Sequence, residues 1–333
     1  MSFKQLLGFS DQEIGYDGAK RRLRQEGSAI TSTENEKRYD AGHLKVVSLT
    51  ELRTRVEGIE KTGPNSFQNI SEDVRALLQN RSYAGALFQV ASQFNLLEMG
   101  DPALRPENGV EIYWSDHSQG PACARTAIGA TLFRNYFIPL NGTFGQTRDN
   151  QLNCLKRVLT WIKNKSPFQW KFRNGYIFIS QKDAEIVNRV LEQATETERE
   201  FLKGELEVGL QWNVQINDDS KPLDQYVSQI FCSAFPIGYH SRTSSAVLQP
   251  LAELILEAAY EATMLAAVIN SIDNENHDLV LTKLGGGYFE NPEQWIARAI
   301  QRALDALPNR SIRVSLNNFR QTERCFTEIH VRD

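Results

Sequence analysis

The stretch LVLTKLGGGYFENPEQWIARAI, residues 279–300, decides the fold class of this chain. The apolar run at 279–284 predicts a buried strand, and the segment after Asn291-Pro292-Glu293 predicts an amphipathic helix. We expect Asn291 to cap this helix and Pro292 to occupy its first position. A strand, a glycine-rich turn and a helix in this order indicate an α/β domain.

The turn between that strand and that helix contains Gly285, Gly286 and Gly287, followed by Tyr288 and Phe289. Glycines let backbone N–H groups approach a ligand closely, and a strand–loop–helix junction favours anions such as phosphate. The alternative is a tight turn that needs glycine for its conformation alone. Three consecutive glycines followed by two aromatic residues favour the ligand loop.

The rest of the chain alternates strands with helices. We expect strands at 44–49, 86–92, 210–216, 227–235, 311–316 and 325–331, and helices at 50–61, 71–80, 121–137, 151–164, 181–204 and 244–271. Ser48 with Glu51 forms a capping-box pattern, Ser71 is a candidate cap, and Asn174-Gly175 predicts a hairpin within 170–180. The segment 32–42 is expected to be a loop or a weakly ordered arm.

This alternation predicts an α/β fold of three layers, α/β/α, with a mixed sheet. Residues 1–70 are expected to form an N-terminal arm and helical extension. Residues 71–333 are expected to form the ligand-binding domain, decorated by a hairpin-helix insertion around 165–204. No internal repeat is visible.

Composition narrows the class of protein. The 333 residues carry a net charge of −4, and no block of lysine and arginine resembles a nucleic-acid-binding element. No apolar run reaches the length of a membrane span, and the N-terminus lacks a secretory signal pattern. Four dispersed cysteines and five dispersed histidines indicate no disulfide framework and no metal site built on cysteine or histidine spacing, although a carboxylate-rich loop can bind Mg²⁺. We expect no cofactor. We expect an intracellular, cytoplasmic protein, although a secreted effector is also compatible with the sequence.

Three segments at the ends of expected strands are rich in small and polar residues. They are QVASQFNLLE at 89–98 with GVEIYWSDHSQGPACA at 109–124, CSAFPIGYHS at 232–241, and the glycine loop. Open α/β sheets bind ligands at the carboxyl ends of their strands. We therefore expect these three segments to meet around one site.

These segments resemble the ligand loops of macrodomains, and in particular the poly(ADP-ribose) glycohydrolase-like branch of that family. The Asp-His-Ser-Gln-Gly-Pro segment at 116–121 is similar to MavL-type hydrolases that remove ADP-ribose from ubiquitin. The resemblance implies a macrodomain-like fold and a site for ADP-ribose or an ADP-ribosylated protein, with ubiquitin as one candidate partner. The ligand-binding residues that it implies are Gln89, Ser92, Asn95, Gln119, Gly120, Ser233, Ala234, Gly238, Tyr239, Gly285, Gly286, Gly287, Tyr288 and Phe289. The chain departs from the family at Gln89 and Ser92, where aspartate and asparagine are usual, and it lacks the family's tandem-glutamate catalytic loop.

The acidic residues between 95 and 119 are the candidates for catalysis, because cleavage of a glycosidic bond uses carboxylates near the reacting carbon. Asp116 is the first choice, since it directly precedes the expected helix, and Glu98 and Glu111 are the second. Each could instead be a surface charge or a helix cap.

Two functions follow as hypotheses. The first is an ADP-ribosyl hydrolase that acts on a modified protein, for instance ubiquitin modified on arginine. The alternative is a macrodomain that binds ADP-ribose or a nucleotide without cleaving it. A P-loop enzyme is disfavoured because no Lys-Ser/Thr follows the glycines, and a serine hydrolase because no G-x-S-x-G sequence occurs. Phe289 and Tyr239 are expected to flank the ligand.

Overall fold

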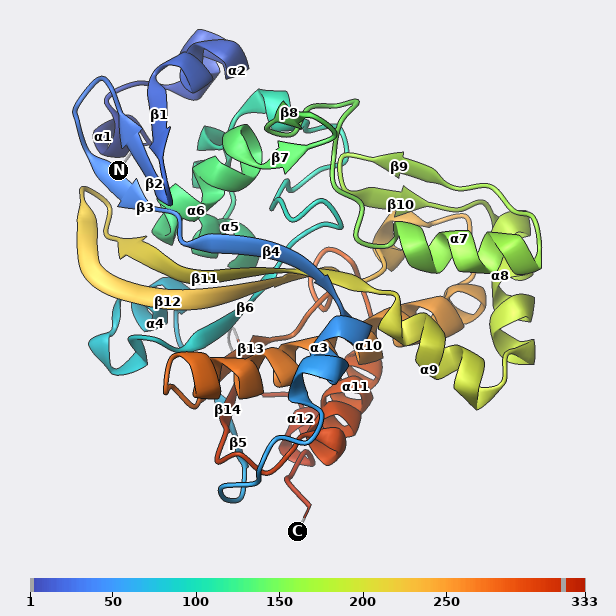
Figure 1. The fold of residues 1–333 in the computed structure, drawn as a ribbon. Coiled ribbons are helices and arrows are strands. Elements are labelled where there is room, and N and C mark those ends of the chain that lie inside the picture. Colours follow the sequence, from blue (N-terminus) through green and yellow to red (C-terminus); the bar gives the residue numbers. More distant parts are fainter. Residues whose placement is uncertain (1–2, 319–321, 333) are drawn as a thin grey trace.

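The computed structural model describes residues 3–318 and 322–332, and a seven-stranded mixed sheet forms its centre (Figure 1). The strand order is β4-β11-β12-β6-β13-β14-β5, parallel from β12 to β5 and antiparallel among β4, β11 and β12. The bounds are β4 His43–Ser48, β5 Ser66–Ile70, β6 Leu87–Ala91, β11 Glu207–Asn217, β12 Pro222–Cys232, β13 Asp278–Thr282 and β14 Arg313–Asn317. The expected α/β fold with a mixed sheet is confirmed.

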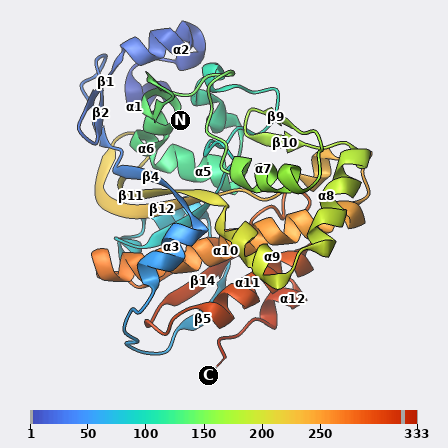
Figure 2. The ribbon, with the colours of Figure 1, turned by 45° about the vertical axis from the view of Figure 1, so that its right-hand side comes forward.

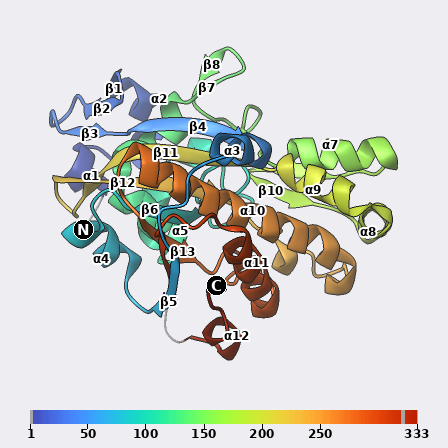
Figure 3. The ribbon, with the colours of Figure 1, turned by 60° about the horizontal axis from the view of Figure 1, so that its bottom comes forward.

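Helices cover both faces of this sheet and complete three layers (Figure 3). One layer contains α3 (Leu49–Val56), α10 (Ser245–Asp273) and α11 (Glu293–Ala306), and the other contains α4 (Val74–Gln79), α5 (Gln119–Thr126) and α6 (Ile128–Leu132). Helix α10 packs against α3, α8 and α11 as well as the sheet. Its own residues are therefore apolar or small on nearly every face. As predicted, Ser48 and Glu51 form a capping box at the start of α3.

The N-terminal arm is an ordered unit. It contains α1 (Phe3–Leu7), α2 (Asp11–Arg21) and a small antiparallel sheet of β1 (Leu23–Glu26), β2 (Ala29–Ser32) and β3 (Arg38–Asp40). Part of the segment expected to be a loop, 32–42, therefore forms strand structure. The two edges of the main sheet, β4 and β5, also come from residues 1–70, so the second half of that segment is built into the sheet.

The insertion lies at one side of the molecule (Figure 2). It contains β9 (Lys171–Arg173), β10 (Tyr176–Phe178), α8 (Gln181–Gln193) and α9 (Glu196–Gly204), and it follows α7 (Lys156–Lys165). Asn174 and Gly175 form the predicted hairpin turn, with φ of 49° and 82°. The single helix expected at 181–204 is wrong, because a capping box between Thr195 and Glu198 starts a new helix.

Three further expectations were wrong in detail. Asp73, not Ser71, caps α4, because the helix begins two residues later than its polar pattern indicates. The helix expected at 121–137 breaks at Ala127, between α5 and α6. The segment 325–331 contains α12 (Arg324–Thr327) and no strand, and strand β5 was not anticipated. A short hairpin of β7 (Pro139–Leu140) and β8 (Thr143–Phe144) follows α6.

Within residues 3–318 and 322–332, no helix is both long enough and apolar enough to cross a membrane.

Candidate functional site

A pocket of about 160 Å³ lies at the carboxyl ends of β6 and β13, the two central strands of the sheet. The helix that follows β6, α5, covers one face of the sheet, and the helix that follows β13, α11, covers the other. Where the helices that follow two neighbouring strands lie on opposite faces, a crevice opens between the strand ends, and open α/β sheets bind ligands in such crevices. The predicted residues that line the pocket are Ser92, Glu98, Asp116, Gln119, Gly120, Ala234, Gly285, Gly287, Tyr288 and Phe289.

The side chain of Gln119 fills the gap where β6 and β13 separate. Their pairing ends at Phe88 and Val280, after which β6 has unpaired backbone groups on that side. Nε2 of Gln119 donates to the carbonyl oxygen of Gln89 (2.8 Å), and its Oε1 accepts from the N–H of Ala91 (2.9 Å). The amide thus replaces the missing strand, and α5 is fixed at the edge of the pocket.

Hydrogen bonds within the glycine loop give it a defined shape. The N–H of Gly286 donates to the carbonyl oxygen of Lys283 (3.0 Å), and Gly285 adopts φ 76° with its Cα packed against Ala234. The side chain of Asn291 donates to Phe235 O at 2.9 Å instead of capping α11, whose N-cap is Pro292. The expected cap and the expected first helical position are therefore wrong, because the Asn291 amide joins this loop to the segment after β12.

Unpaired N–H groups of the loop remain available to a ligand. Within the described part of the chain, no hydrogen-bond partner is found for the backbone N–H of Gly287 or of Tyr288. Both residues line the pocket, and Tyr288 is 75% exposed. Adjacent unpaired N–H groups form a concavity suited to an anion. The N–H of Gly286, expected to join them, is already paired, and the first residues of α11 are not part of the lining.

Asp116 is the half-exposed carboxylate of the pocket. Its Oδ1 accepts from both the N–H (2.8 Å) and the hydroxyl (2.6 Å) of Ser118, the residue that precedes α5. This local turn fixes the orientation of the side chain. Oδ2 lies next to Gly100, where any side chain would clash with it. Asp116 therefore holds the helix start with one oxygen and keeps the other for a further contact.

Glu98 borders the same pocket, but none of its side-chain surface is open to solvent. It lies beneath Gly120, whose Cα has no side chain to separate the two, and Oε1 pairs with Arg134 at 2.8 Å. Burial raises the pKa of Glu98 to about 7, although the Arg134 guanidinium opposes this shift. Oε2 has no partner among the described residues. This geometry makes Glu98 part of the floor of the pocket.

The structure places several predicted site residues outside the lining: Gln89, Asn95, Glu111, Ser233, Gly238, Tyr239 and Gly286. Glu111 accepts a hydrogen bond from the Ser10 hydroxyl in the N-terminal arm. Asn95 is buried and donates to Gln151 at 2.8 Å. Gln89 is buried between β13 and α10, where its amide bonds Thr282 and Thr263.

Tyr176 lines the pocket although the sequence analysis did not select it. It belongs to β10 of the insertion, and its ring contacts Tyr239 (5.1 Å between centroids) and Phe289 (5.5 Å). Tyr239 and Phe289 also contact each other at 6.0 Å, so the three rings form one aromatic cluster in which Tyr176 and Phe289 line the pocket and Tyr239 does not. The Asn174-Gly175 turn, which starts β10, was the one signal that could have drawn attention to Tyr176.

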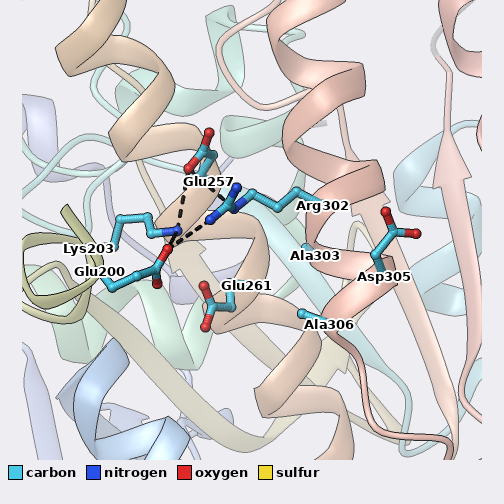
Figure 4. Close-up of a pocket in the computed structure, with 8 residues that line it drawn as sticks. All are labelled: Glu200, Lys203, Glu257, Glu261, Arg302, Ala303, Asp305 and Ala306. Atoms are coloured by element: carbon cyan, nitrogen blue, oxygen red, sulfur yellow. Dashed lines mark hydrogen bonds and ion pairs between the residues drawn. The ribbon is translucent and has the colours of Figure 1, made fainter. Parts of the chain in front are cut away.

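A larger pocket of about 290 Å³ lies between α9, α10 and α11 (Figure 4). Four of its charged side chains point toward one another and form ion pairs, whereas Asp305 points away from them. Lys203 contacts Glu200 and Glu257, and Arg302 contacts the same two carboxylates at 2.8 and 3.5 Å. These pairs join the insertion to the helical layer.

Comparisons with known proteins complete the description. No family model matches the chain, and no curated protein matches it. Among solved structures, poly(ADP-ribose) glycohydrolase from Thermomonospora curvata aligns with a TM-score of 0.47 and 13% identity over 92% of each chain. The enzyme from Deinococcus radiodurans in complex with ADP-ribose aligns with a TM-score of 0.46 and 14% identity, over 85% of this chain and 92% of that one. With TM-scores below 0.5, these likenesses bear on neither substrate nor mechanism.

Proposed function

We propose that this protein hydrolyses the bond between ADP-ribose and a modified protein. One observation carries the proposal: the carboxylate of Asp116, oriented by Ser118, lines the same pocket as the unpaired N–H groups of Gly287 and Tyr288. The N–H groups suit a phosphate, and the carboxylate suits the carbon at which a glycosidic bond breaks. The sequence resemblance to macrodomains joins these two features in one ligand, ADP-ribose.

The chemistry requires water and one positioned carboxylate. Water adds to C1″ of the ribose while the bond from C1″ to the linking atom breaks. Asp116 accepts a proton from the attacking water, and that proton passes to the leaving group. A negative charge beside C1″ also stabilises the positive charge that develops there, an effect that is larger in the transition state than in the ground state.

The size of the pocket defines how the ligand is held. Sites that enclose a whole ligand of this size have volumes of roughly 300–1,000 Å³. The strand-end pocket, at about 160 Å³, therefore accommodates part of ADP-ribose. The remainder extends along the exposed ring of Tyr288, where a nucleotide buries aromatic surface. An open site of this kind leaves room for a protein attached at C1″.

ADP-ribosylated ubiquitin with an arginine linkage is the first protein substrate that we propose. Its support is the resemblance of residues 116–121 to the MavL-type hydrolases. Turnover of the arginine-linked substrate is compared with that of serine- and glutamate-linked substrates, because these differ in the leaving group while the ADP-ribose moiety is the same.

The experiment has two parts. Calorimetric titration with free ADP-ribose measures binding, and release of ADP-ribose from arginine-, glutamate- and serine-linked proteins measures turnover. Absence of binding would contradict both the proposed hydrolase and the ADP-ribose site that the sequence resemblance implies. Binding without release from any linkage would instead identify a reader of ADP-ribose, an alternative favoured by the enclosure of Glu98 within the floor.

A further inference from the structure

The loop that carries Asp116 contains a short 3-10 helix, η3, at Glu111–Ser115. Its preceding residue, Val110, supplies no side-chain cap, so the first N–H groups of η3 need a partner from elsewhere. Asp116 follows η3 directly, and its N–H donates to Tyr113 O at 3.3 Å. The placement of Asp116 therefore depends on what holds the start of η3.

A carboxylate from the N-terminal arm provides that partner. Oδ2 of Asp11, at the start of α2, accepts from the N–H of Val110 at 2.7 Å, and both oxygens lie 3.3 Å from the N–H of Glu111. The hydroxyl of Tyr136 donates to the same Oδ2 at 2.9 Å. Asp11 is 1% exposed. A buried carboxylate surrounded by three donors is tied to this loop and not to solvent.

The backbone of the loop is shaped to lie on this carboxylate. Gly109 has φ 78°, and a side chain there would clash with the carboxyl group of Asp11. The neighbouring Ser10 hydroxyl donates to the side chain of Glu111. Apolar residues of the arm, including Phe3 and Leu6, share one buried cluster with Val110 and Tyr113. The arm and the loop are thus packed together as one unit.

A second line of contacts leads from η3 to the floor of the pocket. The hydroxyl oxygen of Tyr113 accepts from the backbone N–H of Glu98 at 3.2 Å. Both acidic residues that border the pocket, Asp116 and Glu98, are therefore connected to η3, one through the chain and one through this hydrogen bond.

We infer that Asp11 is a positioning residue for the hydrolase: it caps η3 from the N-terminal arm and thereby places Asp116 and Glu98 at the pocket. The inference rests on the proposed function. Removal of the Asp11 charge leaves the glycine loop and its N–H groups unchanged, since they belong to a different strand end. Ligand binding is then preserved, while the carboxylate that acts on C1″ is displaced.

The test uses Asp11→Asn in the full chain, because asparagine has the shape of aspartate and lacks its charge. Hydrogen exchange at the amides of Val110 and Glu111 should accelerate, and kcat for release of ADP-ribose should fall about tenfold or more, as expected for a misplaced catalytic group. KM and the affinity for free ADP-ribose should change less than about threefold.

Tyr39→Phe is the matched control. Tyr39 is buried in the arm, and its hydroxyl donates to Leu6 O at 2.8 Å, so the substitution weakens the arm without touching the loop. At a comparable loss of thermal stability it should leave both exchange at 110–111 and kcat unchanged.

Unchanged exchange in Asp11→Asn would overturn the inference, and so would faster exchange with normal kcat. An equal fall of kcat in the Tyr39→Phe control would also overturn the inference, because general weakening of the arm would then explain the loss of activity. If Asp11→Asn does not fold, Tyr136→Phe removes one donor to the same carboxylate and is judged by the same two readouts. A wild-type protein that releases no ADP-ribose would end the proposed function, whereas exchange at 110–111 would still decide whether Asp11 holds the loop.

Discussion

The two pockets of this protein differ in a way that their sizes do not indicate. In the larger one, between α9, α10 and α11, Lys203 and Arg302 pair with Glu200 and Glu257 (Figure 4). A fifth charged residue of this pocket, Glu261, pairs with Arg53 at 2.6 Å. In the smaller one, Asp116 has a free oxygen, and the backbone N–H groups of Gly287 and Tyr288 have no partner within the described chain. The polar groups of the larger pocket are paired with one another, whereas several of those in the smaller pocket have no partner among the described residues.

The unpaired polar groups, and not the volume, are what single out the smaller pocket as the candidate site. A buried or half-buried polar group without a partner costs free energy, so a fold retains few of them. Ion pairs that are satisfied internally offer a ligand no net gain. We therefore expect substitutions in the strand-end pocket to change function and substitutions in the ion-pair pocket to change stability alone.

The largest effect is expected from Asp116→Asn, which keeps the shape of the side chain and removes its charge. Release of ADP-ribose should fall at least about a hundredfold, at the lower end of what an acid–base group contributes. Affinity for free ADP-ribose should change less than about tenfold, or roughly 1.4 kcal/mol.

Asp101→Asn is the control for that substitution. Asp101 lies in the same long loop and also accepts a backbone hydrogen bond two residues ahead, from Ala103 at 2.6 Å, but it does not line the pocket. It should retain normal turnover. Equal losses in the two variants would show that the turn, and not the charge beside the pocket, is responsible.

A smaller but clear effect is expected from Gly287→Val, measured as ADP-ribose affinity. A Cβ at Gly287 meets no atom within 4 Å, so the fold tolerates it, yet it projects beside the unpaired N–H groups. Affinity should fall by about tenfold or more, equivalent to roughly 1.4 kcal/mol, while the thermal midpoint stays unchanged. Gly286 is less informative because a side chain there would press on Ile296. Wild-type affinity in Gly287→Val would show that this loop is only a turn.

Glu98, in the smaller pocket, should make the free energy of unfolding depend on pH. Burial raises the pKa of Glu98 from 4.5 to about 7 in the folded protein, so the charged form is disfavoured there. The stability that this group contributes is therefore present below about pH 4.5 and is lost as pH rises through about 7.

Urea unfolding at pH 5 and pH 8 measures this loss. Glu98→Gln cannot titrate, so its free energy of unfolding should decline less between the two pH values than that of the wild type, even though Arg134 loses its partner. A decline equal to that of the wild type would assign the titration to other groups, such as Asp11, whose pKa is raised to about 6 by burial.

The smallest effect is expected from Arg302→Met in the larger pocket. About half of the Arg302 side chain is exposed, so its ion pairs should contribute no more than about 1 kcal/mol to the free energy of unfolding. Turnover and ADP-ribose affinity should match the wild type. A change in affinity greater than about threefold would contradict the distinction between the two pockets.

Local patterns in the sequence were sufficient for several features of the fold and the site. The capping box of Ser48 and Glu51 and the hairpin at Asn174-Gly175 depend on residues close together in the chain, and the structure has both. The strand and helix around the glycine loop were also predicted, because their hydrophobic periods are local. The expectation that Asp116 and the loop meet followed from the rule that ligands bind at strand ends.

Tertiary structure alone decided which residues share the pocket. Asn291 looked like a cap but bonds Phe235, and Gln119 replaces a strand beside Gln89 and Ala91. Tyr176 reaches the pocket from the insertion, and Asp11 reaches the loop that carries Asp116 from about a hundred residues away. A side-chain amide or carboxylate can satisfy any unpaired backbone group within reach, and the sequence does not state which distant group that will be. The sequence therefore determined the elements and the chemistry available to them, while the packing of distant segments determined which polar groups were paired and which were left without a partner.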